Sequence, residues 1–311
     1  MKITYSAPAK VILSGEHAVV YGKPAIVSAI DIRLRFSIQE GAGKRQDPHV
    51  EKIAEIVQKY LTEKKLKGSL KKSYVVTIES DIPIGRGLGS SAALSVAGAA
   101  AFLEFFSGKA RSPEIANNLA YQVEKIFHRL PSGVDNSTAA FGGLVYFRKE
   151  FEFLKGIYKV AFKIPQKIEE KLYLIDSGPP LETTADMVNH VGKFYNSHAK
   201  STEQIFNVIE KTTKRLVVSL VKEDGSFFAQ QISENQQLLE KLGVVSNSTK
   251  KLLYGLTKYG VGKITGAGGK KSASGYLLFY ADNPPGLEKR LKKQAVSYMK
   301  FTQSHDGVKK I

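Results

Sequence analysis

A glycine-rich loop joined to an apolar run constrains the fold of this chain more than any other feature. The segment IPIGRGLGSSAALSVAGAA, residues 82–100, holds three glycines and two adjacent serines in front of a run rich in alanine. The strand-like sequence YVVTIES lies just before it. Because residues 90–107 are apolar on nearly all sides, we expect them to form a helix that is buried in a core. The predicted order is therefore strand, glycine loop and buried helix.

The start of this helix has the features of a phosphate-binding site. The first backbone N–H groups of a helix have no partner within it, and the helix dipole adds positive potential there. Glycine backbone lets an anion approach these groups. The hydroxyls of Ser90 and Ser91 can cap the helix, bind phosphate oxygens or bind Mg²⁺. A plain turn with serine caps is the alternative, but it leaves the three glycines without a reason. The usual P-loop pattern, G-x-x-x-x-G-K-[ST], is absent.

Length and composition limit the class of protein. The chain has 311 residues, of which 42% are hydrophobic, and this favours a folded protein of one or two domains. It has no cysteine, which excludes disulfides, cysteine–zinc sites and thiol catalysis. No apolar block follows a basic start at the N-terminus, and no uninterrupted apolar run reaches about 18 residues. We therefore expect a cytoplasmic protein without a membrane segment.

The charge of the chain is strongly positive. Lysine and arginine number 46 against 29 acidic residues, which gives a net charge of +17. Such a balance can indicate a nucleic-acid binder. Here the basic residues are scattered in short pairs, without a basic arm or interleaved aromatic residues. A lysine-coated surface with an anionic small substrate is the preferred interpretation, and we expect no nucleic-acid partner.

The remaining pattern predicts a mixed fold with a change of character near residue 165. Strands are expected within residues 3–40, 73–80, 142–148, 171–178, 262–269 and 274–282, and near the C-terminus. Helices are expected at residues 49–66, 90–107, 113–128, 184–198, 202–222, 226–241, 248–259 and 285–296. Strands and helices do not alternate regularly, so the pattern favours an α+β class over a doubly wound sheet.

Two other loops have the same unexplained character. HRLPSGVDNSTAAFGG, residues 128–143, is interpreted as a loop between a helix and a strand, and it contains Asp135. An aspartate in such a loop is more often a turn-former than a functional group. KITGAGGKKSASG, residues 263–275, is a second glycine loop in the other half of the chain.

Together these motifs resemble the GHMP kinase superfamily, and among its branches they are most similar to the mevalonate kinases. APAKVILSGEHAVVYGKPAI resembles the N-terminal motif, PIGRGLGSSAA the phosphate loop, PSGVDN the catalytic loop and TGAGG the third motif. Their order and spacing agree across nearly the whole chain. The resemblance implies two lobes with the active site in the cleft between them. Residues 1–165 would form a ribosomal S5-like lobe, and residues 166–311 a ferredoxin-like lobe.

The resemblance also implies roles for single residues. Asp135 would be the catalytic base, and Lys10 beside it would lower the pKa of the acceptor alcohol. Glu124 and Ser91 would bind Mg²⁺. ATP contacts are implied for the loop and the helix start, namely Pro83, Gly85, Gly87, Leu88, Gly89, Ser90, Ser91 and Ala92.

The implied reaction is the ATP- and Mg²⁺-dependent phosphorylation of the 5-hydroxyl of mevalonate in isoprenoid biosynthesis. Acceptor contacts are implied for Glu16, His17, Thr183 and Ala267, with Thr184 as an alternative to Thr183. Other small-molecule kinases of the superfamily remain open, such as a phosphomevalonate kinase, a mevalonate 3-kinase or a sugar kinase, and so does a ligand sensor without turnover. The resemblance also leaves a homodimer open.

Three departures from the family pattern bear on the acceptor. Lys270 and Lys271 stand where the third motif usually has glycine, Arg86 stands where a small residue is common, and Arg129 with Leu130 replaces the usual residues before PSGVDN. Arg86 and Lys270 could add phosphate contacts. They therefore keep an acceptor with an additional phosphate in consideration.

Overall fold

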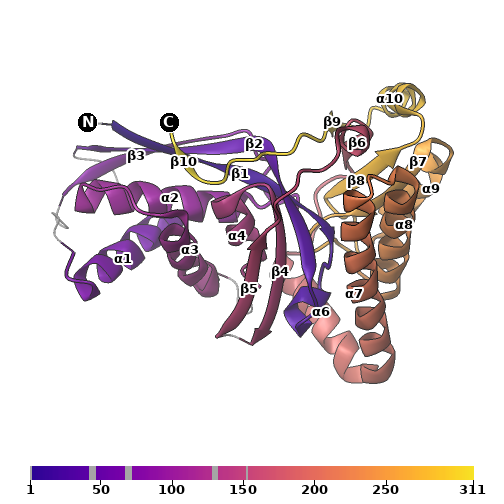
Figure 1. Ribbon diagram of the computed structural model, residues 1–311, viewed down its shortest axis with the longest axis horizontal. Coiled ribbons are helices and arrows are strands. Elements are labelled where there is room, and N and C mark those ends of the chain that lie inside the picture. Colours follow the sequence, from indigo (N-terminus) through magenta and orange to yellow (C-terminus); the bar gives the residue numbers. More distant parts are fainter. Residues whose placement is uncertain (1, 42–46, 67–71, 128–131, 152) are drawn as a thin grey trace.

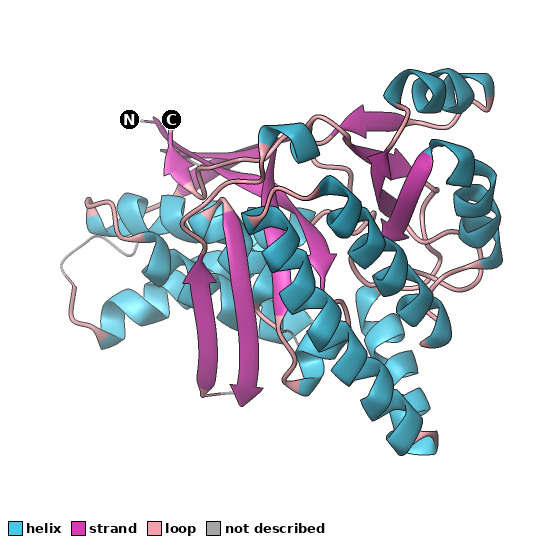
Figure 2. Cartoon of the chain, turned by 45° about the vertical axis from the view of Figure 1, so that its right-hand side comes forward, coloured by secondary structure: helices cyan, strands magenta, loops and turns pink. Residues whose placement is uncertain are grey.

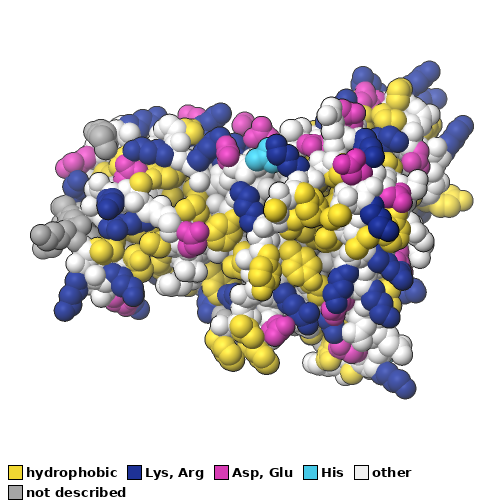
Figure 3. Space-filling view, viewed as in Figure 1, with side chains coloured by type: hydrophobic (Ala, Val, Ile, Leu, Met, Phe, Trp, Pro, Cys, Tyr) yellow, Lys and Arg dark blue, Asp and Glu magenta, His cyan; other side chains and the backbone are white. Residues whose placement is uncertain are grey.

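The protein consists of two sheet-and-helix lobes joined side by side (Figures 1 and 2). The computed structural model describes residues 2–41, 47–66, 72–127, 132–151 and 153–311. Within these residues, the α+β class expected from the sequence is confirmed. Lysine and arginine side chains are spread over both lobes on the face shown in Figure 3, as the scattered pairs predicted.

The first lobe contains an antiparallel sheet of six strands. Its order is β10-β1-β2-β4-β5, and β3 also pairs with β2. The strands are β1 (Lys2–Ser14), β2 (Ala25–Glu40), β3 (Tyr74–Ser80), β4 (Leu144–Phe151), β5 (Leu154–Lys159) and β10 (Lys309–Lys310). The helices of this lobe are α1 (Pro48–Glu63), α2 (Ser90–Ser107), α3 (Pro113–Phe127) and α4 (Val134–Phe141), and a short 3-10 helix, η1 (Ala18–Tyr21), follows β1.

Helix α2 is the central core helix, as predicted. It packs against β1, β2, α1, α3 and α4. Gly89 and Gly108 flank it in the left-handed conformation, with φ of 79° and 70°, which glycine adopts without steric cost. Within the described residues α2 is long and apolar enough to cross a membrane, but 78% of that stretch is buried inside the protein. Its apolar surface is therefore covered by the fold itself.

The second lobe contains an antiparallel sheet of four strands in the order β7-β8-β6-β9. These are β6 (Leu172–Asp176), β7 (Gly260–Ile264), β8 (Tyr276–Ala281) and β9 (Tyr298–Lys300). The helices of this half are α5 (Gln166–Glu169), α6 (Thr184–Ser197), α7 (Ala199–Val221), α8 (Gly225–Lys241), α9 (Asn247–Leu256), the 3-10 helix η2 (Thr257–Tyr259) and α10 (Pro284–Lys293). The long helices α7 and α8 pack against each other, and α8 packs against β7 (Figure 1).

The end of the chain returns to the first lobe. Strand β10 pairs with β1, with Tyr5 opposite Lys310, and the two ends of the chain lie close together (Figure 1). The Lys310 ammonium donates to Glu104 Oε1 of α2 at 2.6 Å. The change of sheet falls between β5 and β6, which is where residue 165 lies, but the last strand belongs to the first sheet. The domain boundary at residue 165 stays a prediction.

The prediction of a loop over residues 128–143 is wrong for the second half of this segment. Residues 134–141 form α4, and Asp135 lies in its first turn. The sequence of α4 shows no clear apolar stripe, because the side of the helix that faces the core includes polar residues, among them Ser137 and Thr138. The hydroxyls of Ser137 and Thr138 donate to the carbonyls four residues earlier, at 2.8 and 2.9 Å. His128, Arg129 and Leu130 lie outside the described residues. Strand β5 was also not predicted.

Candidate active site

The glycine loop between β3 and α2 is held by contacts that only glycine allows. Gly85, Gly87 and Gly89 all have positive φ, at 69°, 85° and 79°. A Cβ atom on Gly87 would lie 2.7 Å from the Thr265 carbonyl oxygen, and one on Gly89 would lie 2.9 Å from Lys10 Cγ. A Cβ on Gly85 would meet no atom within 4 Å. Two of the glycines therefore allow close packing, and the third leaves the loop open.

The other expected ATP-binding residues divide into two groups. Leu88 and Ala92 are buried, and the Leu88 carbonyl accepts a hydrogen bond from the Lys10 backbone N–H at 3.0 Å. Pro83 and Ser90 are half-buried and Ser91 is exposed. Only the second group offers side chains to a ligand at the start of α2.

Lys10 and Asp135 form an ion pair beside this loop. Lys10 Nζ lies 3.2 Å from Asp135 Oδ1. The lysine is 3% exposed, while Asp135 is 29% exposed and therefore reachable. Because the Lys10 stem packs against Gly89, this ion pair lies next to the N-terminus of α2. Residues from β1, the glycine loop and α4 thus meet at one place.

Glu124 of α3 lies close to this pair. Burial and the nearby Asp135 raise the pKa of Glu124 to about 8. Its Oε2 atom is buried and has no hydrogen-bond partner among the described residues. With a pKa of about 8, this carboxyl group is mostly protonated at pH 7, and a divalent cation bound beside it would favour its ionised form.

Few side chains that could bind a metal gather at this place. The described residues contain no group of three or more His, Cys, Asp or Glu side chains that could hold a metal. Mg²⁺ is usually bound by one or two carboxylates, with phosphate and water as its other ligands. Glu124 supplies one such carboxyl group, and its pairing with the Ser91 hydroxyl at one ion stays a prediction.

Glu16 forms a buried ion pair with Lys263 of β7. The two side chains are 1% and 0% exposed, and the Lys263 ammonium also donates to the carbonyls of Ile12 and Ile264, at 3.1 and 2.7 Å. Lys263 was missed in the sequence, although a charged residue inside a short apolar strand was a signal. Glu16 was expected to contact the acceptor, and the structure places it in an internal contact between the lobes.

His17 and Ala267 are brought together as expected for one site. The His17 Nε2 atom lies 3.0 Å from the Ala267 carbonyl oxygen. Burial lowers the pKa of His17 to about 4. The imidazole is therefore neutral at pH 7, and its Nε2–H donates to the carbonyl. This contact joins the turn after β1 to the third motif.

Thr183 is the N-cap of α6. Its hydroxyl donates to Asp186 Oδ2 at 2.7 Å and accepts from the Asp186 backbone N–H at 3.1 Å, which completes a capping box. The hydroxyl expected to contact the acceptor is thus already used in capping. The acceptor contact of Thr183 stays a prediction.

The two foreign basic residues have different surroundings. Arg86 in the glycine loop forms an ion pair with Asp176 of β6, and its carbonyl accepts from the Tyr276 N–H at 3.1 Å. It therefore links the phosphate loop to the second lobe. Lys270 is exposed, and its Nζ lies 3.3 Å from His190 Nδ1 of α6.

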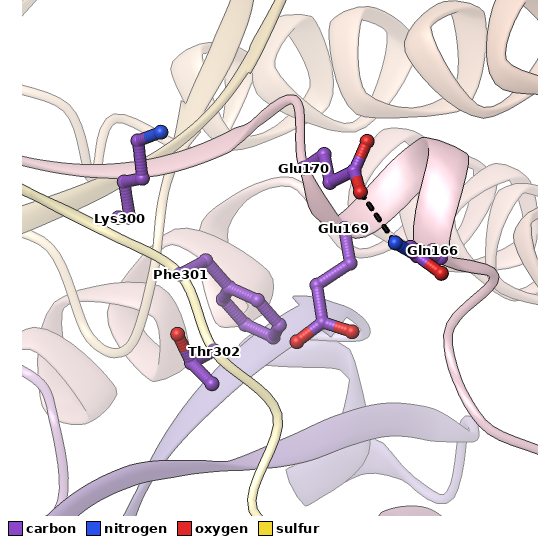
Figure 4. Close-up of a pocket in the computed structure, with 6 residues that line it drawn as sticks. All are labelled: Gln166, Glu169, Glu170, Lys300, Phe301 and Thr302. Carbon is purple, nitrogen blue, oxygen red and sulfur yellow. Dashed lines mark hydrogen bonds between the residues drawn. The ribbon is translucent and has the colours of Figure 1, made fainter.

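A separate pocket lies between α5 and the C-terminal segment (Figure 4). It is lined by Gln166, Glu169, Glu170, Lys300, Phe301 and Thr302. Gln166 donates to Glu170 at 2.6 Å, and Glu169 accepts from the Gln303 backbone N–H at 2.7 Å. None of the expected site residues lines this pocket, and Glu169 holds the C-terminal segment through Gln303.

Comparison with known proteins identifies the family of this chain. Residues 49–143 match the family model for the GHMP kinases N terminal domain. A mevalonate kinase from Archaeoglobus fulgidus is 33% identical over 302 residues, covering 90% of this chain and 94% of the relative. One from Pyrococcus abyssi is 32% identical and covers 85% of each chain.

Solved structures share the fold. The alignment with a Listeria innocua protein covers 100% of this chain and 99% of the Listeria chain, with a TM-score of 0.83 and 18% identity. The L. major mevalonate kinase was solved in complex with R-mevalonate. Its alignment covers 97% of this chain and 96% of the L. major chain, with a TM-score of 0.76 and 24% identity. These likenesses confirm the two-lobed fold, and the sequence relatives establish that the chain belongs to the mevalonate kinase family of the GHMP kinases.

Proposed function

We propose that this protein transfers the γ-phosphoryl group of ATP to the 5-hydroxyl of mevalonate. The observation that carries the proposal is the Lys10–Asp135 ion pair, which lies against Gly89 at the N-terminus of α2. Phosphoryl transfer needs a cradle for the phosphates and an activating group at the attacking alcohol. These two requirements meet at this point.

The proposed roles follow from position and charge. The backbone N–H groups at the start of α2 bind the phosphates of ATP, and the open backbone at Gly85 gives them access. The Asp135 carboxylate accepts the proton of the acceptor hydroxyl. The Lys10 ammonium stabilises negative charge that develops on the alcohol oxygen. Glu124 and Ser91 would hold Mg²⁺, which supplies charge neutralisation at the phosphates when bound.

Mevalonate is proposed as the acceptor because of the relatives. The A. fulgidus and P. abyssi relatives are named mevalonate kinases, and the L. major structure is described with R-mevalonate. The fold alone does not select the acceptor, because a Streptococcus pneumoniae phosphomevalonate kinase shares it at a TM-score of 0.76 and 15% identity. The proposal includes a cytoplasmic location, where ATP is supplied.

An acceptor screen tests the proposal. ADP release is followed with Mg-ATP and, in turn, mevalonate, phosphomevalonate, galactose and homoserine, with an acceptor-free sample as the control. We expect rapid ADP release with mevalonate only. No release with any acceptor, together with mevalonate binding, would identify a ligand sensor instead. Release with a different acceptor only would transfer the assignment to that kinase.

A further inference from the structure

The loop of the third motif places a lysine ammonium next to α6, where the family pattern has glycine. Lys270 Nζ lies 3.3 Å from His190 Nδ1. An ammonium group has only donors, so the imidazole Nδ1 has to accept this hydrogen bond. Burial and the nearby Lys270 lower the pKa of His190, which agrees with a neutral imidazole. His190 therefore holds the ammonium in place and leaves its other N–H donors unused.

The ammonium of Lys270 forms no ion pair with an acid of the described residues. Two acids are close to this loop. Glu182 partly offsets the lowering of the His190 pKa that burial and Lys270 cause, and its Oε2 atom has no hydrogen-bond partner among the described residues. Glu182 accepts a hydrogen bond from the Lys271 backbone N–H at 3.1 Å, and Asp186 closes the capping box of α6. An exposed ammonium that forms no ion pair with a described carboxylate is suited to bind an anion.

The contacts of this loop relate Lys270 to His17, which is expected to contact the acceptor. The same loop, three residues earlier, accepts the hydrogen bond from His17 through Ala267. His190 also lowers the pKa of His17 after the larger effect of burial, so the two imidazoles lie within electrostatic range. Helix α6 packs next to η1, because Tyr21 stacks on Tyr195 with ring centroids 5.1 Å apart. Lys270 is thus connected to His17 through His190 and through Ala267 of its own loop.

We propose that Lys270, held by His190, binds the carboxylate of the acceptor and makes this chain selective for an acceptor with an anionic end. This inference rests on the proposed function, in which Asp135 acts on the hydroxyl at the opposite end of mevalonate. Lys270 determines specificity and takes no part in the chemistry. Its effect should therefore appear in KM for the acceptor and leave kcat nearly unchanged.

The test compares charge-removing and charge-retaining variants. Lys270→Gln removes the charge at similar length, and Lys270→Arg retains it. Lys271→Gln is the matched control, because it removes a neighbouring charge of the same loop. Each is assayed with mevalonate and with the triol in which the carboxylate of mevalonate is reduced to an alcohol. We expect Lys270→Gln to raise KM for mevalonate at least about tenfold, since a charge-assisted hydrogen bond is lost.

The other expected results separate charge recognition from a structural effect. KM for ATP stays within about twofold, Lys271→Gln changes KM for mevalonate less than about threefold, and Lys270→Arg recovers most of the loss. The neutral triol should be turned over equally by the wild type and Lys270→Gln. Added salt should raise KM for mevalonate more in the wild type than in Lys270→Gln.

Two failures are distinguishable. If the wild type does not phosphorylate mevalonate, the proposed function falls. If the wild type does so and Lys270→Gln keeps its KM for mevalonate within about threefold, the carboxylate site alone is overturned. Equal losses on mevalonate and on the triol would also overturn it, because they would indicate a structural role.

Discussion

Single residues at the centre of the site combine charge with burial. Asp135 is partly exposed and faces the nearly buried Lys10 at 3.2 Å, and Glu124 lies next to them with its pKa raised to about 8. The resemblance to known motifs was enough to single out these three residues. It could not single out Lys263 or Asp176. Their partners, Glu16 and Arg86, come from the other lobe, and a single sequence does not reveal such pairing.

Asp135→Asn should abolish turnover without loss of ATP binding. The amide is nearly isosteric but cannot accept the proton of the alcohol. Single-turnover rates measure the chemistry, and calorimetric titration with ATP measures binding. In a variant that keeps more than about a tenth of the wild-type kcat, the activation barrier would be raised by less than ~1.4 kcal/mol. Such an increase is too small for the loss of a catalytic base.

Glu124→Gln and Ser91→Ala should both raise the Mg²⁺ concentration needed for half-maximal rate and lower kcat. If the two groups meet at one ion, their effects are coupled, and the double variant loses less than the sum of the single losses. The measurement is a double-mutant cycle across a Mg²⁺ titration. Strictly additive losses with an unchanged Mg²⁺ dependence would argue against a shared metal.

His17 should make stability depend on pH between about 4 and 6.5. The unfolded chain takes up a proton at the ordinary pKa of about 6.5, whereas burial lowers the pKa in the folded state to about 4. Below pH 6.5 the unfolded state therefore binds more protons, so this stabilisation is complete above pH 6.5 and is lost as the pH falls toward 4.

Urea unfolding of the wild type and His17→Gln from pH 7 to pH 4 measures this effect. Glutamine retains an N–H for the Ala267 carbonyl and does not titrate. The wild type should lose more free energy of unfolding than the variant, by on the order of 3 kcal/mol. Parallel curves would mean that His17 is protonated equally in both states.

At the scale of elements, prediction from sequence depended on whether the pattern was local. The apolar run of α2 and the glycine loop before it predicted the helix Ser90–Ser107. Helix α4 was missed because its buried polar residues gave no apolar stripe. Strand β5 was missed because it is a short strand at the edge of the sheet. It is a strand because it pairs with β4, and its own sequence pattern does not reveal that pairing.

The phosphate loop should respond differently to the same change at two glycines. Gly85→Ala and Gly87→Ala share the strain of a positive φ, which costs about 1 kcal/mol. Only the Gly87 variant also places a methyl group against the Thr265 carbonyl. Urea unfolding without nucleotide should show Gly87→Ala to be less stable than Gly85→Ala by about 1–3 kcal/mol. Equal losses would mean that the loop does not pack on the second lobe as described.

The whole molecule depends on contacts between the lobes that the sequence did not reveal. Arg86 pairs with Asp176, the Ile12 N–H donates to the Thr265 hydroxyl at 2.8 Å, and β10 returns to β1. The two-lobed arrangement followed from the family resemblance, but these links depend on side-chain packing. The ion pair with Asp176 also bears on the choice of acceptor, because it occupies Arg86, which was considered as a cation for an additional phosphate.

The relative rate on mevalonate and phosphomevalonate is the most direct test of the central claim. Phosphomevalonate would bring a second dianion to the γ-phosphate, and such repulsion costs several kcal/mol without additional cations. Lys10 is paired with Asp135, Arg86 is paired with Asp176, and Lys270 contacts His190. Steady-state assays with Mg-ATP should give a kcat/KM for mevalonate at least about a hundredfold higher, ~2.7 kcal/mol. Equal or faster turnover of phosphomevalonate would contradict the account.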